Sequence, residues 1–560
     1  MNTPEKPDKA DTPDKAEKAE KANTPEKAQK PEPAKAAEPA KAAEPEKPEA
    51  AKPGKSEPGK AEPDEPEPQK LDELEGERRL STGVAGLDEV LHGGVLPGRT
   101  YVVRGGPGSG KTMLGLHFLT AGAANGERTL FITVEEPTEQ IRRDARALGF
   151  NLEGVTFLDL TPGAEFFMKA QSYDIFTPAE VEREPTTRMI VEEVESLRPE
   201  RVFLEAMTQF RYLSPDSFQY HKQVLSLLRY LEEQGATVLF TSEGGELATD
   251  EHLQFLSDGV LHLESTTAGR SVQVTKFRGS DFEAGPHSLR LTDRGMEVFP
   301  RLVPRRHGRQ FLSEMVPSGI RGIDEQLHGG IERGTVTVIT GPTGVGKTTL
   351  GLSFVKEAAA RGERSCIYMI EESVETMMTR SEALGIPARE MIERGALTAV
   401  HVEPLRYGPD EFAHLVREQV EKRHVRIIML DSISGYRLCV HGDDLARHVH
   451  ALCAYLRNMG VTVLLVNEIE SITGDFAATD IGIGHLADNI VFLRYLEFRG
   501  RLERAVGVLK KRVSSFETTL REFEITPVGI RVGRPLTELR GILTGYPEVA
   551  KNGSKGSRAA

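Results

Sequence analysis

Short apolar runs alternate with longer amphipathic stretches along most of this chain. The runs are rich in β-branched side chains, which is typical of strands buried on both faces. They lie at Thr100–Val103, Leu130–Val134, Val202–Leu204, Thr237–Thr241, Thr335–Ile339, Ser365–Ile370, Ile427–Leu430 and Val461–Val466. Helical patterns, such as Thr112–Ala124 and Gln219–Gln234, separate them. The alternation predicts an α/β fold, with mostly parallel sheets flanked by helices on both faces.

The sequence also contains an internal repeat. Shifted by 236 residues, it matches itself without a gap for about 70 positions. The coincidences include Gly83, Gly86, Asp88, Leu91, His92, Gly93, Gly94 and Gly98, which fall on Gly319, Gly322, Asp324, Leu327, His328, Gly329, Gly330 and Gly334. The period is far longer than a solenoid unit, so each copy is expected to be a whole domain. We expect the first domain at residues 71–303 and the second at 304–546, with a linker at Arg301–Gln310.

The two ends of the chain have a different composition. Residues 1–70 consist almost wholly of Pro, Glu, Lys, Ala and Asp. Such a segment has too little apolar surface to offset the entropy cost of ordering. Residues 1–70 and 547–560 are therefore expected to be disordered tails.

Charge and cysteine content narrow the range of functions. The net charge of −14 argues against a dominant nucleic-acid-binding surface, which needs clustered positive charge. The three cysteines, Cys366, Cys439 and Cys453, form no CxxC motif, as expected of free thiols in a reducing compartment. No apolar run approaches the roughly 20 residues of a membrane span, and the polar N-terminus does not resemble a signal peptide. We expect a cytoplasmic protein with no membrane partner.

Each copy carries a glycine-rich motif between a predicted strand and a predicted helix. The two motifs are Gly105-Gly106-Pro107-Gly108-Ser109-Gly110-Lys111-Thr112 and Gly341-Pro342-Thr343-Gly344-Val345-Gly346-Lys347-Thr348. Both fit GxxxxGK[ST], in which backbone N–H groups at a helix N-terminus converge on phosphate oxygens. Lys111 and Lys347 are expected to reach the β- and γ-phosphates of ATP, and Thr112 and Thr348 to ligate Mg²⁺.

Two kinds of carboxylate complete the predicted sites. A buried strand in each copy ends in an acid suited to hold Mg²⁺, Glu205 in the first and Asp431 in the second. The extra methylene of the glutamate leaves the metal geometry of the first copy open. The acidic doublets Glu135-Glu136 and Glu371-Glu372 begin 24 residues after each motif lysine, at the end of a predicted strand. They are the candidates for orienting the attacking water.

Together these landmarks resemble one family, the KaiC-like ATPases of the RecA-type P-loop class, named after a circadian clock protein. Besides both motifs and both doublets, the resemblance rests on Thr82-Gly83, Gly86-Leu87-Asp88 and the stretch from Asp488 to Tyr495. It implies a double-ring homo-hexamer with ATP bound between neighbouring subunits. It also implies that a Lys-x-Arg on a late strand reaches the neighbour's γ-phosphate. Lys276, Arg278, Lys510 and Arg512 match that pattern.

The chain departs from the family at one functional position. The resemblance implies an adjacent Ser-Thr pair that accepts phosphate from ATP in the second domain. Gly484-His485 stands there instead, and neither side chain carries a hydroxyl. The nearby Thr479-Asp480 does match a Thr-Asp pair of the family, so Thr479 is the residual candidate acceptor.

The sequence thus predicts an oligomeric enzyme that binds and hydrolyses ATP and acts in signalling or in regulating a protein partner not yet identified. A weak serine/threonine autokinase activity stays open. One alternative is a RecA/RadA-like DNA-dependent ATPase, although the acidic balance gives it little support. The other is a nucleotide-gated scaffold with little turnover at one or both sites, which Glu205 makes conceivable for the first.

Overall fold

The structure is a computed structural model that describes residues 78–161, 178–213, 216–243, 251–267, 269–403, 406–439, 445–469, 483–544 and 547–549. The predicted N-terminal tail lies outside these ranges. The described chain contains two lobes, each built on a nine-stranded sheet. This arrangement confirms the predicted α/β class and the tandem organisation.

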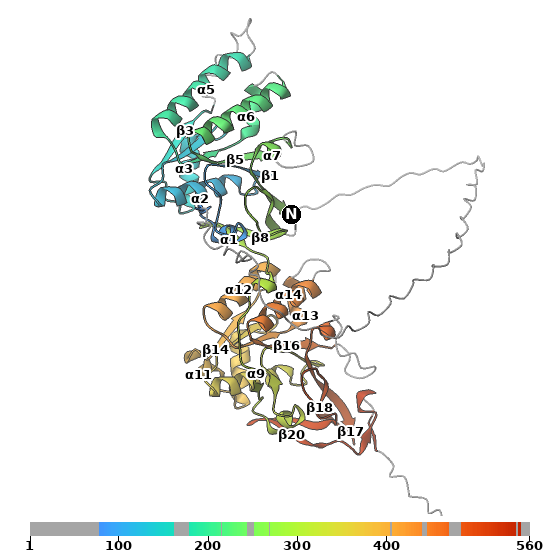
Figure 1. The fold of residues 1–560 in the computed structure, drawn as a ribbon. Coiled ribbons are helices and arrows are strands. Elements are labelled where there is room, and N and C mark those ends of the chain that lie inside the picture. Colours follow the sequence, from blue (N-terminus) through green and yellow to red (C-terminus); the bar gives the residue numbers. More distant parts are fainter. Residues whose placement is uncertain are drawn as a thin grey trace, which may run out of the picture. The chain divides into compact units, whose positions relative to one another are not determined.

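The first lobe begins with helix α1 and ends with strand β9 (Figure 1). Its helices are α1 (Ala85–Val90), α2 (Lys111–Ala124), α3 (Thr138–Ala147), α5 (Pro178–Leu197), the 3₁₀ helix η1 (Met207–Leu213), α6 (Ser217–Glu233) and α7 (Leu253–Leu256). Its strands are β1 (Thr100–Gly105), β2 (Thr129–Thr133), β3 (Val155–Asp159), β4 (Arg201–Leu204), β5 (Thr237–Glu243), β6 (Gly259–Thr266), β7 (Gly269–Phe277), β8 (Pro286–Thr292) and β9 (Gly295–Phe299). The 3₁₀ helix η2 (Pro304–Arg306) lies in the predicted linker.

The second lobe repeats this order. Its helices are α8 (Arg321–Gln326), α9 (Lys347–Ala360), α10 (Val374–Ala383), α11 (Ala388–Glu393), α12 (Pro409–Glu421), α13 (Ile433–Tyr436), η3 (Arg437–Cys439), α14 (Leu445–Asn458), η4 (Ile483–His485) and η5 (Ile542–Thr544). Its strands are β10 (Met315–Val316), β11 (Ile331–Glu332), β12 (Val336–Gly341), β13 (Ser365–Met369), β14 (Leu397–His401), β15 (Ile427–Asp431), β16 (Thr462–Glu468), β17 (Asn489–Phe498), β18 (Arg501–Lys511), β19 (Arg521–Thr526), β20 (Gly529–Pro535), β21 (Leu539–Arg540) and β22 (Glu548–Val549).

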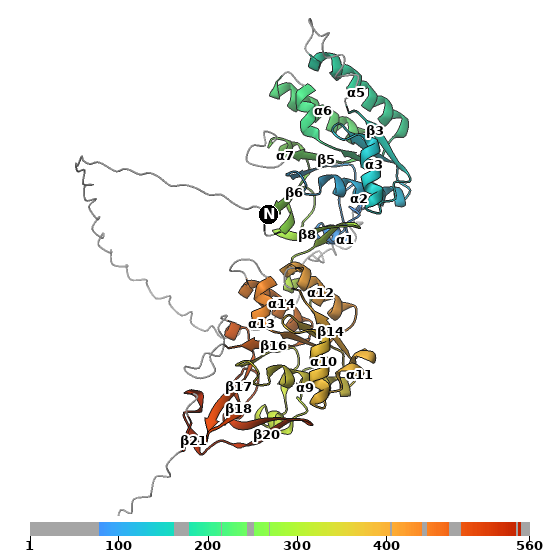
Figure 2. The same cartoon turned by 180° about the vertical axis from the view of Figure 1, so that it is seen from behind.

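The two large sheets have equivalent strand orders. They are β3-β2-β4-β5-β1-β6-β7-β8-β9 in the first lobe and β14-β13-β15-β16-β12-β17-β18-β19-β20 in the second. The first six strands of each sheet are parallel, and the last three add to it in antiparallel pairs. Figure 2 shows β18 and β20 extending from the parallel part of the second sheet. In both lobes, the strand that precedes the glycine-rich motif lies inside the parallel part.

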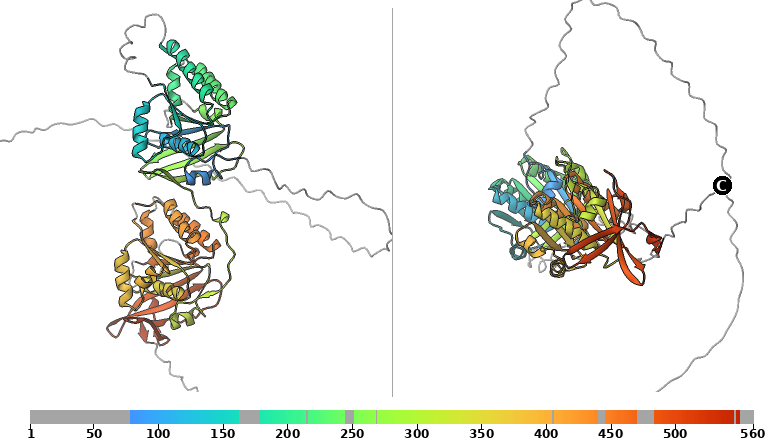
Figure 3. Two further views of the ribbon diagram at one scale, coloured as in Figure 1. Left: turned by 90° about the vertical axis from the view of Figure 1, so that its left-hand side faces the viewer. Right: turned by 90° about the horizontal axis from the view of Figure 1, so that it is seen from below.

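Each sheet is buried on both faces by helices, as the continuous apolar strands require. In the first lobe, α1, α2 and α3 pack on one face and α5, α6 and α7 on the other. In the second, α8 to α11 pack on one face and α12 to α14 on the other. The further views in Figure 3 show the strands between helices in each lobe. None of the described helices is both long and apolar enough to cross a membrane.

Two features differ from the sequence-based expectation. The edge strands β7 to β9 and β18 to β20 were not predicted. In β7 and β8, for example, buried residues alternate with more exposed ones and form no continuous apolar run. The predicted C-terminal tail begins at residue 547, but Glu548–Val549 form a short strand that pairs in antiparallel fashion with Leu539–Arg540.

Candidate nucleotide site

The glycine-rich motif of the first lobe connects β1 to α2. The chain enters the helix through Gly110, whose φ of 103° lies in the left-handed region that favours glycine. Because this N-cap residue has no side-chain acceptor, the first-turn N–H groups of α2 have no side-chain cap. The Nζ of Lys111 folds back over the loop and donates to the carbonyl oxygens of Gly105 at 2.7 Å and Gly106 at 3.0 Å. An uncapped helix N-terminus beside an ammonium group fits a phosphate.

The second motif, between β12 and α9, has the same construction. Gly346 enters the helix with a φ of 113°, and the Nζ of Lys347 donates to the carbonyl oxygen of Pro342 at 2.9 Å. Burial lowers the pKa of both Lys111 and Lys347, while neighbouring carboxylates oppose the shift. A cavity of about 490 Å³ opens over this motif, within the range of small-ligand sites. It is lined by Thr343, Gly344, Gly346, Lys347, Thr348, Thr349, Glu371, Glu372, Arg380, Leu384, Asp431, Glu468 and Ile525.

A threonine hydroxyl and a carboxylate meet in each lobe. Thr112 Oγ1 donates to Glu205 Oε1 at 2.5 Å, and Thr348 Oγ1 donates to Asp431 Oδ2 at 2.7 Å. The glutamate therefore reaches the same partner as the aspartate despite its extra methylene. Hydroxyl and carboxylate oxygens are hard donors of the kind Mg²⁺ takes, so both pairs fit a magnesium site.

Both of these acids lie in poorly hydrated surroundings. Burial raises the pKa of Glu205 and of Asp431 above the usual range, and the hydrogen bond from each threonine opposes the rise. In the second lobe, the positive charge of Arg380 also opposes it. A bound divalent cation would restore the charge balance of the ionised carboxylates.

The predicted glutamate doublets follow β2 and β13, at the same sheet edge as the glycine-rich motifs. In the second lobe both members have partners: Ser432 Oγ donates to Glu371 Oε1 at 2.7 Å, and Arg380 lies 2.8 Å from Glu372 Oε2. In the first lobe, Glu135 and Glu136 are exposed and add to the rise in the pKa of Glu205. The structure thus brings the doublets together with the motif lysines and the Thr–carboxylate pairs.

The Lys-x-Arg residues lie at the other edge of the sheet. Lys276 is paired with Val260, near the first residue of β6, whereas the motif follows Gly105, which is paired with Leu263. Lys276 Nζ donates to the carbonyl oxygens of Gln254 at 2.9 Å and Ser257 at 2.5 Å, and Arg278 lies 3.5 Å from Asp258. These residues therefore point away from the nucleotide site of their own lobe.

The second copy is arranged in the same way. Lys510 is paired with Ile490 near the start of β17, and its Nζ donates to the carbonyl oxygens of Gly484 at 3.1 Å and Ala487 at 2.6 Å. Arg512 lies 3.2 Å from Asp488. In both lobes, the Lys-x-Arg residues therefore lie away from the P-loop of the same lobe.

Sequence reasoning missed two further carboxylates of the sites. Glu243 ends β5 and is paired with Gly105, and Glu468 ends β16 and is paired with Gly341. Glu468 Oε2 lies 4.0 Å from Lys347 Nζ. Both follow a predicted strand by two residues, at the sheet edge where α/β sites form, and that position was the available signal. Ser432 gave no sequence signal, because it lies 61 residues from Glu371. Arg380 gave none either, because an arginine on a helix usually indicates a solvated surface.

Each lobe has a mostly parallel sheet with helices on both faces, and a glycine-rich loop that leads into a helix. A Thr–carboxylate pair lies beside that loop. These features define the RecA-type class of P-loop ATPases. Two such domains occur in tandem. The family model described as the KaiC ATPase matches residues 80–303 and again residues 316–537. The chain belongs to the KaiC ATPase family.

Individual relatives match across both lobes. The circadian clock oscillator protein KaiC of Synechococcus elongatus is 28% identical over 484 residues, covering 84% of this chain and 92% of that protein. The KaiC of Parasynechococcus marenigrum is 27% identical over 485 residues, with 84% and 93% covered. The circadian clock protein KaiC3 of a Synechocystis species is 26% identical over 492 residues, with 85% and 95% covered.

Proposed function

We propose that this chain binds Mg²⁺·ATP at both P-loops and hydrolyses it, with the second lobe as the main site of turnover. The observation that carries the proposal is the Thr348–Asp431 pair at 2.7 Å, which shares one cavity with Lys347 and both glutamates of the doublet. The same cavity combines an anion-binding helix end, a hard-metal donor pair and the carboxylates of the doublet. Phosphoryl transfer to water needs these three elements.

Each residue has a proposed role in the second site. When bound, Mg²⁺·ATP supplies the bond that breaks, between the terminal phosphorus and the oxygen bridging to ADP. Lys347 and the first-turn N–H groups of α9 hold the phosphates, while Thr348 and Asp431 hold the metal. Glu371, oriented by the hydroxyl of Ser432, accepts a proton from water as the oxygen of that water bonds to phosphorus. The Pβ–O–Pγ bridging oxygen leaves with ADP.

A different balance of roles is proposed for the first site. Lys111, Thr112 and Glu205 have the contacts needed to hold Mg²⁺·ATP. At the position of Ser432, however, the first lobe carries Ala206, which has no hydroxyl to orient Glu135. We therefore propose slower turnover there, with nucleotide occupancy serving a structural or gating purpose.

The proposal extends to assembly and output. Lys276, Arg278, Lys510 and Arg512 lie at the sheet edge opposite their own P-loops, which supports contact with nucleotide on a neighbouring copy. A homo-hexamer with ATP between subunits accounts for that placement. Nucleotide-dependent assembly would then regulate an as yet unidentified protein partner. Hydrolysis, and not self-phosphorylation, is the proposed main reaction.

The assignment is tested on the full chain in a Lys111→Ala background, which isolates the second site. Lys347→Ala should then abolish nucleotide binding. Glu371→Gln together with Glu372→Gln should keep binding but lose turnover, because the amides retain the shape and lack the base. Unchanged ATPase activity in that double variant would refute the assignment. A large rise in turnover on adding DNA would favour the recombinase-like alternative.

A further inference from the structure

The second site contains a cation that belongs to neither the P-loop nor the Lys-x-Arg pair. Arg380, on α10, lines the same cavity as Lys347 and Asp431. Its guanidinium lies 2.8 Å from Glu372 Oε2, and the side chain is 41% exposed. Glu372 is held a second time through its backbone, because its carbonyl oxygen lies 3.2 Å from His401 Nδ1. The second glutamate of the doublet is therefore fixed in place on the side of α10.

The first lobe has the opposite charge at this position. The residue 236 positions before Arg380 is Asp144, on α3. Its carboxylate is 60% exposed and lies 3.5 Å from the neighbouring Arg143. The two sites of one chain therefore differ at the same helix position, a guanidinium in the second and a carboxylate in the first.

The charge on Arg380 has a specific consequence for the doublet. Two adjacent carboxylates beside Asp431 and Glu468 repel one another and repel the phosphates of ATP. A guanidinium bound to Glu372 offsets one of these charges. It also holds that side chain towards α10, while Glu371 is bonded to Ser432 on the other side. The arrangement gives the two glutamates different partners, a charged one for Glu372 and a hydroxyl for Glu371.

We propose that Arg380 is a positioning residue of the second ATPase site, which holds Glu372 aside so that Glu371 alone orients the attacking water. The inference rests on the proposed hydrolysis at this site. It assigns Glu372 a supporting role and gives the second lobe a device that the first lobe lacks. Because Arg380 acts through Glu372, its loss should lower kcat more than it changes KM.

The test uses the full chain with Lys111→Ala and begins by measuring second-site turnover. Lys347→Ala should remove the ATPase activity of this background. If the background has no such activity, the proposed function fails, independently of the role of Arg380. If it does, Arg380→Ala should lower kcat roughly tenfold, short of the 100-fold or more that loss of a general base costs. KM for ATP should change by less than about threefold, and Arg380→Lys should restore part of kcat, since it keeps the charge.

A double-mutant cycle separates positioning from a general structural effect. In a Glu372→Gln background, Arg380→Ala should have little further effect on kcat, because the partner charge is already gone. The matched control is Arg389→Ala. Arg389, on α11, is 45% exposed and pairs with Glu375 and Glu382 of α10, the helix that carries Arg380, but it does not line the cavity. It should leave kcat unchanged.

Three results would overturn the inference. The first is an unchanged kcat in Arg380→Ala. The second is a rise in KM at constant kcat, which would indicate that Arg380 binds phosphate directly. The third is an equal loss of kcat in the Arg389→Ala control.

Discussion

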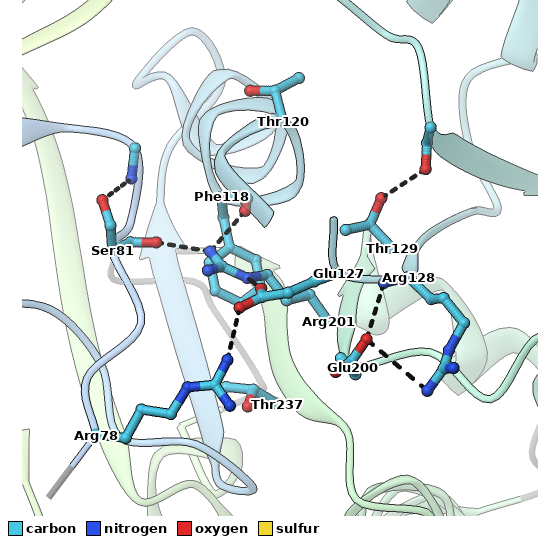
Figure 4. A network of polar contacts seen from close by, with 12 residues as sticks. Arg78, Ser81, Phe118, Thr120, Glu127, Arg128, Thr129, Glu200, Arg201 and Thr237 are labelled. Atoms are coloured by element: carbon cyan, nitrogen blue, oxygen red, sulfur yellow. Dashed lines mark hydrogen bonds and ion pairs between the residues drawn. The ribbon is translucent and has the colours of Figure 1, made fainter. Parts of the chain in front are cut away.

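Arg201 and Glu127 form an ion pair inside the first lobe, with the arginine side chain wholly excluded from solvent (Figure 4). Arg201 Nη1 also donates to the carbonyl oxygens of Ser81 at 2.6 Å and Phe118 at 2.9 Å, and the guanidinium lies 4.8 Å from the centre of the Phe118 ring. One arginine at the start of β4 thus connects α2, the segment before α1 and the loop before β2.

The second lobe neutralises the equivalent glutamate from a different element. Glu363, 236 residues after Glu127, pairs at 2.6 Å with Arg333, which follows β11 and is also fully buried. The position corresponding to Arg201 is Ile427, the first residue of β15. The duplicated domains therefore kept the carboxylate and exchanged the buried arginine that neutralises it.

Replacing Arg201 should destabilise the first lobe selectively. Arg201→Met leaves the buried Glu127 carboxylate paired with the exposed Arg78, at 3.3 Å. Removing one partner of a buried ion pair costs about 3–5 kcal/mol. Hydrogen exchange of the full-length chain, followed by mass spectrometry, should show faster exchange in peptides from α2 and β4 and no change in the second lobe. Arg321→Met, which removes an exposed pair, is the control. Unaltered protection of α2 would contradict the prediction.

The buried carboxylate of Asp431 should make the ligand-free second lobe sensitive to pH. Because burial raises its pKa, the folded state holds this proton more tightly than the unfolded state. Its contribution to stability is then largest at low pH and falls as pH rises from the unfolded pKa through the raised folded pKa. Without Mg²⁺, Asp431→Asn should therefore raise the unfolding temperature at pH 7.5 and reduce its dependence on pH.

The same substitution should remove the effect of the metal. Mg²⁺·ATP should stabilise the parent chain more strongly at pH 7.5 than at lower pH, because the metal needs the ionised carboxylate. Asp431→Asn should lose most of this stabilisation. Thermal unfolding in EDTA and in Mg²⁺·ATP, across a pH series, measures both effects. Asp144→Asn, at an exposed carboxylate, is the control. A variant less stable than the parent in EDTA at pH 7.5 would contradict the role given to burial.

Sequence patterns predicted four adjacent parallel strands of each sheet, β2-β4-β5-β1 and β13-β15-β16-β12, and they did so for a physical reason. Strands buried on both faces, such as Ile427–Asp431, are continuous apolar runs with an acid at the end. The P-loops, the acids that end β4 and β15, and the doublets were all predicted because each is a local pattern repeated at an equivalent place in both copies. The exposed edge strands were not predicted. β20, for example, buries none of its residues and carries no apolar run.

The partners that differ between the two sites could not be predicted. Ser432 lies 61 residues from Glu371, and the Arg201–Glu127 pair spans 74 residues. Arg380 is only eight residues from Glu372, but an arginine on an exposed helix usually indicates a solvated surface. Its contact depends on how α10 packs beside the end of β13, which is a property of the tertiary structure.

Active sites completed between subunits should allow two inactive variants to restore activity when mixed. A chain with Lys510→Ala and Arg512→Ala keeps its own P-loop and doublet, so it should bind ATP yet hydrolyse it at least tenfold more slowly if these residues act across an interface. A Glu371→Gln chain lacks the base but retains Lys510 and Arg512. Mixed hexamers would contain some sites with every group intact, so the ATPase activity of the mixture should exceed the sum of its parts.

Light scattering accompanies that experiment and should give the mass of a hexamer in Mg²⁺·ATP. The parent chain diluted with inert protein is the control for concentration effects. A chain that stays monomeric in saturating ATP and still hydrolyses it at the full rate would contradict the role across the interface. So would a failure of the mixture to regain activity although both variants enter the same hexamers.

The final prediction concerns phosphorylation. Transfer to a side chain needs a hydroxyl held in line with the γ-phosphate, and a P-loop with its metal gives only activation. Gly484 and His485, where the family resemblance implies the acceptor pair, offer none, and their carbonyl oxygens accept hydrogen bonds from Lys510 and Arg512 instead. We therefore expect hydrolysis as the main reaction and no stable phosphoserine or phosphothreonine at this position.

Thr479, which lies outside the described residues, is the first acceptor to test, with Thr479→Ala as the matched variant. Incubation with labelled ATP followed by peptide mapping should detect at most a trace of label, lost in that variant. Stoichiometric phosphate on another serine or threonine of the second lobe would show that this chain holds a different hydroxyl in line with ATP, and that the absence of a hydroxyl at Gly484 and His485 does not remove kinase chemistry.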